Sequence, residues 1–358
     1  MQVSGGAMID PGIVNRSQVA MRRVRCAIVA LILVIAQRLI GRVNLYGREF
    51  MNNLDRLDEY KDSPEYRKVH EQIKTLGLID HIEHLDEYGY TVIPPELVAP
   101  EEFQERLRAA VLDVHERRSG EKIDLADIAS TGLSKKELPG MAHCSILEED
   151  PIFQDAVLNP TVLTVGKYLC GESALLSDIT CLLKQRHEKM THPLHTDQHG
   201  TPPPLPPYAQ VANVTWALTE YTKDTGSTAI VPKSHLKGRY PLPEEMNFLK
   251  EGAPVMPIAI EAAAGSLIVW RGDTWHGSFP RETPGLRLNL IVIFTRCYMR
   301  QIRDFKNDFP RDILECQPDE FARLLGINAM YPFKNGRPPK PSDSANQDMM
   351  KAGSNPWA

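Results

Sequence analysis

Two short stretches of this sequence carry side chains that can bind one metal ion between them. The first, over residues 190–199, contains a His-x-Asp pair formed by His195 and Asp197. Residues two apart in an extended segment point to the same side, so this imidazole and this carboxylate can reach one ion. The second stretch, over residues 272–278, contains His276. Two His and one carboxylate form the facial triad that holds non-haem Fe(II) and leaves positions open for a co-substrate and O2.

Each of these residues could also have a purely structural role, and the presence of Arg287 favours the metal site over that alternative. A His-x-Asp pair arises often by chance, and an isolated His such as His276 is more often a hydrogen-bonded structural residue. Arg287 lies in an apolar segment, where a charge is costly unless it is paired. A guanidinium grips a carboxylate with two hydrogen bonds, so Arg287 indicates an anchor for a keto-acid co-substrate. Ser278 can add a hydroxyl donor there, although turn serines commonly serve only to close turns.

The elements that must bring these residues together are predicted to be short strands. After Gly171, apolar segments alternate with turn residues, and no long helix intervenes. Strands are predicted over 174–184, 211–220, 228–231, 255–260, 266–270 and 286–295. Many short strands in succession favour a sandwich or jelly roll. In the last strand, Arg287 and Asn289 share one face, and the other face carries Leu286, Leu288, Leu290, Val292 and Phe294. One face should therefore pack on helices, while the other lines an interior that holds polar groups.

Helical patterns flank these strands and set the predicted domain boundaries. Charged or amphipathic helices are predicted over 46–78, 79–87, 100–118, 151–169 (split by a proline) and 310–325, with one strand over 89–95. The predicted organisation is an N-terminal extension with a short apolar run (1–45), a helical segment (46–84), a β-domain (85–300), a C-terminal helical segment (301–334) and a disordered tail (335–358).

Composition narrows the class of protein. The 358 residues are 42% hydrophobic, which suits one large domain or two small ones. The net charge of −5 provides no basic field for nucleic acid. Six scattered Cys without a CxxC pair indicate reduced thiols and a cytoplasmic protein. The apolar run from Cys26 to Ala36 is too short for a bilayer span of about 20 residues. For residues 21–40, membrane contact, a cleaved signal and a poorly packed extension are alternative interpretations.

Taken together, the motifs resemble the phytanoyl-CoA dioxygenase family of Fe(II)/2-oxoglutarate oxygenases. The matching pieces, in order, lie at 192–197, 216–220, 226–235 and 275–278, followed by Arg287. The resemblance implies a fold that is mainly β with α additions, a double-stranded β-helix (jelly-roll) barrel flanked by helices. By motif, it implies iron ligands at His195, Asp197 and His276. It implies 2-oxoglutarate binding by Arg287 and Ser278, and places Trp216 beside the co-substrate. His143 matches a pocket-lining position only loosely.

The expected function is therefore a dioxygenase that uses Fe(II), O2 and 2-oxoglutarate to hydroxylate or otherwise oxidise a small organic substrate, with release of succinate. Two alternatives stay open. One is a cupin-like isomerase or hydrolase with Zn or Mn at the same ligands, which would not need Arg287. The other is a non-catalytic ligand-binding barrel, which would not need all three ligands. Candidate substrates are an acyl-CoA, an amino acid derivative or a secondary metabolite, and no feature indicates an oligomeric state.

Overall fold

The structure, a computed structural model, describes residues 60–125, 141–186, 191–198, 200–327 and 355–357. The chain divides into two compact units, 1–58 and 59–358, and all described residues belong to the second. The predicted N-terminal extension with its apolar run lies outside the described residues, as does most of the predicted tail. In the described part, no helix combines the length and the apolar character that a bilayer crossing requires.

In the described part of the chain, two helices precede the first strand. The first is α2 (Pro64–Thr75), where the Ser63 hydroxyl accepts a hydrogen bond of 3.2 Å from a backbone N–H of the first turn. The second is α3 (Ile79–Tyr88), which ends at Gly89 with a φ of +83°. A Cβ at Gly89 would lie 2.4 Å from the Thr274 hydroxyl oxygen, so both the backbone angle and the space require glycine here. The Thr274 hydroxyl donates to the Gly89 carbonyl at 2.8 Å, which ties the end of α3 to the turn that precedes His276.

Three further helices pack together behind the strands. The long helix is α4 (Glu101–Ser119), and a short 3-10 turn, η1 (Pro95–Leu97), comes before it. Next are α5 (Pro151–Leu158) and α6 (Pro160–Cys170), each with a proline in its first turn and a capping side chain, from Asp150 and Asn159. The predicted interruption of this stretch by a proline is confirmed.

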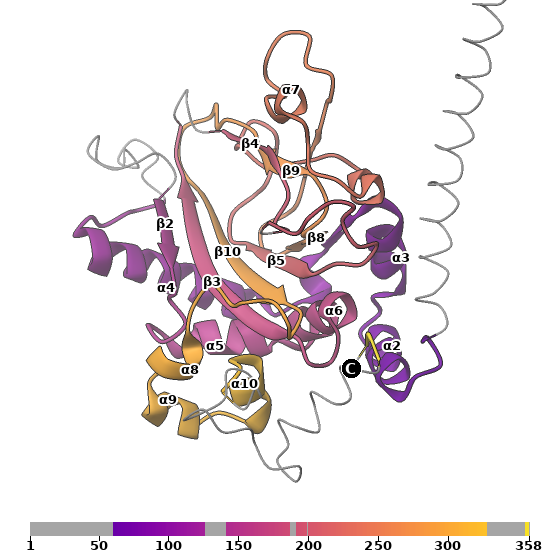
Figure 1. Cartoon of the computed structure of the whole chain (residues 1–358). Coiled ribbons are helices and arrows are strands. Elements are labelled where there is room, and N and C mark those ends of the chain that lie inside the picture. Colours follow the sequence, from indigo (N-terminus) through magenta and orange to yellow (C-terminus); the bar gives the residue numbers. More distant parts are fainter. Residues whose placement is uncertain (1–59, 126–140, 187–190, 199, 328–354, 358) are drawn as a thin grey trace, which may run out of the picture. The chain divides into compact units, whose positions relative to one another are not determined.

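The described residues form two antiparallel sheets, and the larger one has six strands. In spatial order these are β1 (Tyr90–Ile93), β8 (Leu267–Arg271), β5 (Val211–Ala217), β10 (Arg287–Thr295), β3 (Leu175–Lys184) and β2 (Met141–Cys144). Figure 1 shows the two long strands β3 and β10 side by side through the centre of the molecule. Their register places Arg287 opposite Lys184.

The smaller sheet has four short strands, in the order β4 (His192–His195), β9 (His276–Ser278), β6 (Thr228–Ile230) and β7 (Ile258–Ala259). The connection from β6 to β7 contains η2 (Ser234–Lys237) and α7 (Pro243–Met246). In Figure 1, α7 lies above the β4–β9 pair.

The large sheet has two faces of different character, as the alternation in the last strand predicts. The face toward the helices, here called the outer face, joins the main hydrophobic core. From β10 it contributes Leu288, Leu290, Val292 and Phe294. The inner face is turned toward the small sheet and carries Arg287 and Asn289 from the same strand, both buried. A second, smaller apolar cluster lies between the sheets: Ala217, Tyr221, Ile230, Ile260, Ala262, Ile268 and Trp270.

The C-terminal part closes one end of the molecule. It contains α8 (Phe305–Asp308), α9 (Arg311–Glu315) and α10 (Asp319–Leu324), which lie below the long strands in Figure 1. Residues 355–357 fall within the predicted disordered tail, yet they hold a defined position. The Trp357 ring lies 4.8 Å from that of Tyr66 on α2, and its carbonyl accepts a hydrogen bond of 2.9 Å from the Glu172 N–H.

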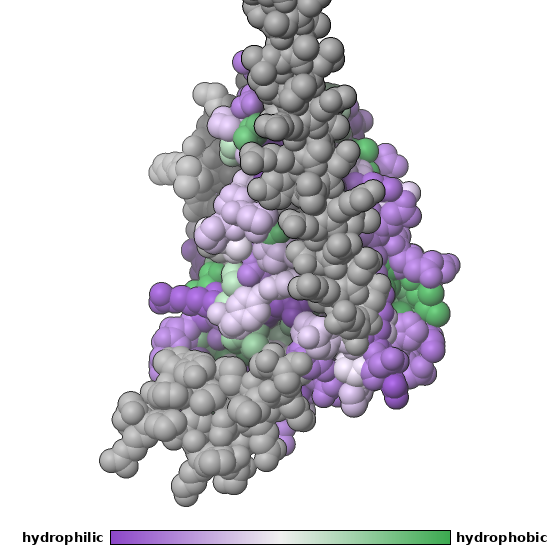
Figure 2. Space-filling view, turned by 45° about the vertical axis from the view of Figure 1, so that its right-hand side comes forward, coloured by the Kyte–Doolittle hydropathy of each residue, from purple (hydrophilic) through white to green (hydrophobic). Residues whose placement is uncertain are grey.

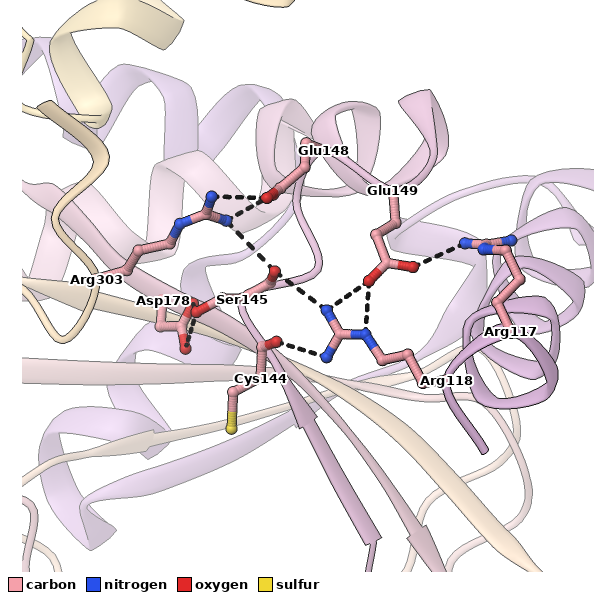
Figure 3. A network of polar contacts seen from close by, with 8 residues as sticks. All are labelled: Arg117, Arg118, Cys144, Ser145, Glu148, Glu149, Asp178 and Arg303. Atoms are coloured by element: carbon pink, nitrogen blue, oxygen red, sulfur yellow. Dashed lines mark hydrogen bonds and ion pairs between the residues drawn. The ribbon is translucent and has the colours of Figure 1, made fainter. Parts of the chain in front are cut away.

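A polar network fixes the helices to the edge of the large sheet (Figure 3). Arg118 of α4 donates to Glu149 at 2.6 Å and to the carbonyl of Cys144, which ends β2. Arg303 forms a two-bonded ion pair with Glu148, at 2.7 Å through one of its nitrogens. Figure 2 brings the side of α2 and α3 forward, and the described surface there is mainly hydrophilic.

Candidate metal centre

The three predicted metal ligands come together where β4 meets β9. His195 ends β4 and His276 begins β9, and the two residues are direct partners in the pairing of these strands. Asp197 follows two residues after His195, and its backbone N–H donates to the Gly272 carbonyl at 2.7 Å. One ligand atom from each of the three side chains lies within 4.8 Å of the other two. Hydrogen bonding between the backbone segments therefore gathers the triad before any ion binds.

Both imidazoles are oriented as metal ligands. The Nδ1 atom of His195 lies 2.8 Å from the Pro193 carbonyl, and that of His276 lies 2.9 Å from the Thr274 carbonyl. A carbonyl can only accept, so each Nδ1 carries the proton, and each Nε2 keeps a lone pair for a cation. The Nε2 atoms face Asp197, at 3.7 Å from Oδ1 for His195 and 3.3 Å from Oδ2 for His276.

The electrostatics of the centre also suit a cation. Burial lowers the pKa of His276 and outweighs the opposing effect of Asp197, so its imidazole is neutral and free to coordinate. The His276 side chain is buried, whereas His195 and Asp197 are 40% and 22% exposed. The centre is thus closed on one side and open on the other. Two neutral nitrogens and one carboxylate on adjacent backbone segments are the donor set that fits Fe(II) with open positions.

A residue that the sequence analysis did not identify holds the carboxylate. Asn213 lies on the inner face of β5, and its side-chain amide donates to Asp197 Oδ2 at 2.7 Å. Asn213 is buried, in a strand where every residue is buried. A buried amide needs hydrogen-bond partners, so a single Asn in a fully buried strand indicates a polar partner inside the fold. This is the sequence feature from which the role of Asn213 could have been predicted.

Ser278 and Arg287, the predicted co-substrate residues, both lie next to Lys184, and Arg287 has no ion pair with an acid among the described residues. Ser278 ends β9, and its hydroxyl accepts from the His192 N–H at 3.1 Å. Arg287 begins β10, donates to the Gly226 carbonyl and lies with its guanidinium carbon 4.6 Å from the centre of the Tyr221 ring. Its Nε is buried and has no hydrogen-bond partner in the part of the chain that the structure describes. This buried arginine therefore keeps an unused donor among the described residues.

Trp216 and His143 do not join the site. Trp216 is three residues after Asn213 in the same strand, so it points to the opposite, outer face. There it packs on Phe103 of α4, with ring centres 5.6 Å apart, within the main core. His143 likewise contacts a helix, with its Nε2 atom 3.1 Å from Nδ1 of His115. The predicted place of Trp216 beside the co-substrate is not supported by this position, nor is a pocket-lining role of His143.

Comparison with known proteins assigns the family. The family model for phytanoyl-CoA dioxygenase (PhyH) matches residues 85–289, which is more than half of the chain. The chain belongs to the phytanoyl-CoA dioxygenase family. The match spans all three triad residues as well as Ser278 and Arg287. It confirms the resemblance inferred from the motifs, and with it an oxygenase of the Fe(II)/2-oxoglutarate-dependent class.

Individual relatives are distant. Dioxygenase af480 of Aspergillus fumigatus is 27% identical over 284 residues, which cover 76% of this chain and 86% of that protein. An uncharacterized protein of Mycobacterium tuberculosis is 28% identical over 207 residues, 55% of this chain and 72% of its own. Among solved structures, HygX from Streptomyces hygroscopicus with nickel and 2-oxoglutarate bound has a TM-score of 0.48 at 16% identity, covering 63% of this chain and 89% of that one.

Proposed function

We propose that this member of the family is an Fe(II)/2-oxoglutarate-dependent dioxygenase that hydroxylates, or otherwise oxidises, a small neutral organic molecule. The observation that carries the proposal is the pairing of two features. One is a triad of His195, Asp197 and His276 with both Nε2 atoms turned toward the carboxylate. The other is the buried Arg287, without an acid partner among the described residues. We further propose that the two facing sheets form a double-stranded β-helix.

The protein's own residues contribute positioning rather than proton transfer. His195, Asp197 and His276 would hold the ion, and Asn213 would keep the carboxylate in orientation. Arg287 and Ser278 would bind the distal carboxylate of 2-oxoglutarate, which fixes the keto-acid end toward the triad. When bound, iron and 2-oxoglutarate together supply O2 activation with release of succinate and CO2. The apolar cluster between the sheets would help to exclude water from this chemistry.

Arg287 separates this proposal from a cupin-like isomerase or hydrolase. Such an enzyme would use the same three ligands but would have no need for a buried guanidinium with an unused donor. A non-catalytic barrel would need neither this guanidinium nor the matched histidine tautomers. The family's dioxygenase character adds to this argument.

The substrate class follows from charges outside the site. An acyl-CoA would need free cations for its phosphates, and the loops after β6 carry Lys233 and Arg239. Each already has an acid partner: Lys233 pairs with Glu87 at 2.8 Å, and Arg239 pairs with Glu245 at 2.6 Å. Lys237, which lies between them in the sequence, has no ion pair among the described residues, and its Nζ lies 4.9 Å from the centre of the Trp275 ring. One such lysine is fewer cations than the phosphates of a CoA ester require, so we favour a secondary metabolite or another uncharged molecule.

The cellular setting is also a proposal. All five described cysteines are free, and burial raises the pKa of Cys170 and Cys181 to about 12, which makes these thiols unreactive. A reducing, cytoplasmic location suits such a protein. Contact of residues 21–40 with a membrane is a further proposal, and these residues lie outside the described part.

The test is an anaerobic titration of Fe(II) and then 2-oxoglutarate, followed by the weak visible charge-transfer band of the complex. We expect the band in the wild type and not in His276→Ala. Under air, the wild type should convert 2-oxoglutarate to succinate. Absence of the band and of succinate in the correctly folded wild type would refute the proposed function.

A further inference from the structure

Three cationic side chains are buried together at the end of the sheets where β3, β9 and β10 meet. They are Lys184, Arg281 and Arg287, which are 3%, 7% and 4% exposed. No carboxylate among the described residues forms an ion pair with any of them. The buried Arg271, by contrast, binds Asp273 at 2.7 Å. Buried charges are costly without partners, so a cluster of like charges of this kind indicates an anion supplied by a ligand.

Lys184 holds a defined place in this cluster. It ends β3 directly opposite Arg287, and its Nζ donates to the Ser278 hydroxyl at 2.9 Å and to the Phe279 carbonyl. An ammonium group has three protons, so one is left for another acceptor. The Ser278 hydroxyl accepts from Lys184 and from the His192 N–H, which occupies both of its lone pairs. Its own proton is therefore available for donation as well.

The turn before β6 holds these groups in place. Gly226 has a φ of +78°, and a Cβ at this residue would lie 2.9 Å from Lys184 Cε. The same residue's carbonyl accepts from Arg287. Close packing of this backbone on both side chains limits their freedom, so the donors are preorganised for a ligand rather than disposed at random.

We propose that Lys184 is a further co-substrate-binding residue, whose ammonium group shares the distal carboxylate of 2-oxoglutarate with Arg287 while Ser278 donates its proton to the same group. This inference rests on the proposed function. Each bond is a charge-assisted hydrogen bond in a buried setting, the class of hydrogen bond that contributes most to affinity. The proposal assigns Lys184 to the distal carboxylate alone, so the keto-acid end should bind without it.

The protonation state of Lys184 makes the proposal distinctive. Burial first, and then the charges of Arg287 and Arg281, lower the pKa of Lys184 to about 6. Among the described residues, a further titratable group that interacts with it is His192 of β4, whose own pKa is lowered by burial and then by His195 and Lys184. A carboxylate that reaches Lys184 favours the ammonium form again. Above pH 6, 2-oxoglutarate should therefore bind together with a proton, and its affinity should fall as the pH rises.

The experiment compares two keto acids by anaerobic calorimetry on the full chain loaded with Mn(II), a redox-stable stand-in. 2-Oxoglutarate has the distal carboxylate and 2-oxobutyrate lacks it. In Lys184→Met, we expect the Kd for 2-oxoglutarate to rise by about 10- to 100-fold, the loss of one hydrogen bond to a charged group. The Kd for 2-oxobutyrate should not change. Titrations in buffers of different ionisation enthalpy should show proton uptake with 2-oxoglutarate in the wild type and none in the variant.

Two controls distinguish the possible outcomes. Lys223→Met removes a nearby exposed lysine, which lies 5.6 Å from the Phe279 ring, and should leave both affinities unchanged. At pH 6 and below, where Lys184 is charged in the ligand-free protein, the Tm of the metal-free Lys184→Met protein should equal or exceed that of the wild type, because a buried cation without an acid partner is removed. Should Lys184→Met bind 2-oxoglutarate as the wild type does, or lose stability without losing the carboxylate preference, this inference is wrong and the proposed function stands. Failure of the wild type itself to bind 2-oxoglutarate would overturn both.

Discussion

Replacing Asn213 with Ala tests whether the metal ligands are held by a residue that touches no metal itself. The change removes the 2.7 Å hydrogen bond to Asp197 Oδ2 and leaves the three ligands in place. A hydrogen bond to a charged group contributes about 1.5–3 kcal/mol, which corresponds to about 10- to 150-fold in affinity. Loss of an outer partner of a ligand typically weakens metal binding by about 10- to 100-fold. We therefore expect the Kd for Mn(II) to rise by about 10- to 100-fold in Asn213→Ala.

Calorimetric titration of the metal-free protein with Mn(II) gives this number directly. The matched control is Thr215→Val, two residues along the same strand and on the same inner face. The Thr215 hydroxyl is buried without a partner in the described part of the chain, so the isosteric change should alter the metal Kd less than about twofold. A thermal scan of both variants checks the fold. If Asn213→Ala binds Mn(II) as tightly as Thr215→Val does, Asn213 does not orient the ligand.

Four other outcomes are expected. Asp197→Ala should abolish succinate formation, because the triad loses its only anionic ligand; full activity in a coupled succinate assay would show that the ligand assignment is wrong. Arg287→Ala should raise the 2-oxoglutarate requirement at least tenfold, about 1.4 kcal/mol, and an unchanged KM for 2-oxoglutarate would remove its anchoring role. The folded-state pKa of Lys184, about 6 against an ordinary 10.5, means that the unfolded chain binds one more proton between these values. Urea unfolding should therefore show that the free energy of unfolding of the wild type, relative to that of Lys184→Met, rises with pH above 6. The slope should be up to about 1.4 kcal/mol per pH unit, and a difference that does not change with pH would contradict this pKa. Trp357→Ala should lower the free energy of unfolding by about 2 kcal/mol, less than for a wholly buried tryptophan, and equal urea midpoints would show that the contact with Tyr66 is not stabilising.

The regular elements were predictable because each is encoded by its own sequence pattern. The alternation in 286–295 predicts which residues of β10 face the core, and Leu288 and Phe294 do so while Arg287 faces inward. The split between α5 and α6 follows from Pro160, which lacks the N–H that a continuous helix needs. In these cases local propensity and burial agree.

The strands that carry the ligands were harder to predict because they form through their partners. β4 has four residues including Pro193, and β9 has three including Gly277, so neither shows an alternating pattern. A Cβ at Gly277 would lie 2.4 Å from the His192 carbonyl oxygen, which shows how closely the two backbones approach. This approach, rather than strand propensity, sets the register that brings the ligands together.

The alternation of side chains along β5 predicts which residues face the metal centre, and the motif resemblance did not take this alternation into account. Asn213 and Trp216 are three residues apart in one strand, so only one of them can face the metal centre. The resemblance selected the tryptophan, whereas the structure places the amide at the carboxylate and the indole against α4. Lys184 is a similar case, because a lysine that ends an otherwise buried strand needs a partner that its neighbours in sequence do not provide.

The two faces of the large sheet show how the fold tolerates a site that is costly to build. The outer face provides the main hydrophobic core with the helices, and this burial stabilises the chain. The inner face carries the unfavourable groups: a lysine whose pKa is lowered by burial, and buried polar atoms without partners on Arg287, Asn289 and Thr215 among the described residues. Because both faces belong to the same strands, the core on one side fixes the positions of charges that would otherwise repel one another on the other side. Binding of an anion can then relieve an electrostatic cost that the folded chain already bears, and this is why affinity for 2-oxoglutarate and the pH dependence of stability should depend on the same lysine.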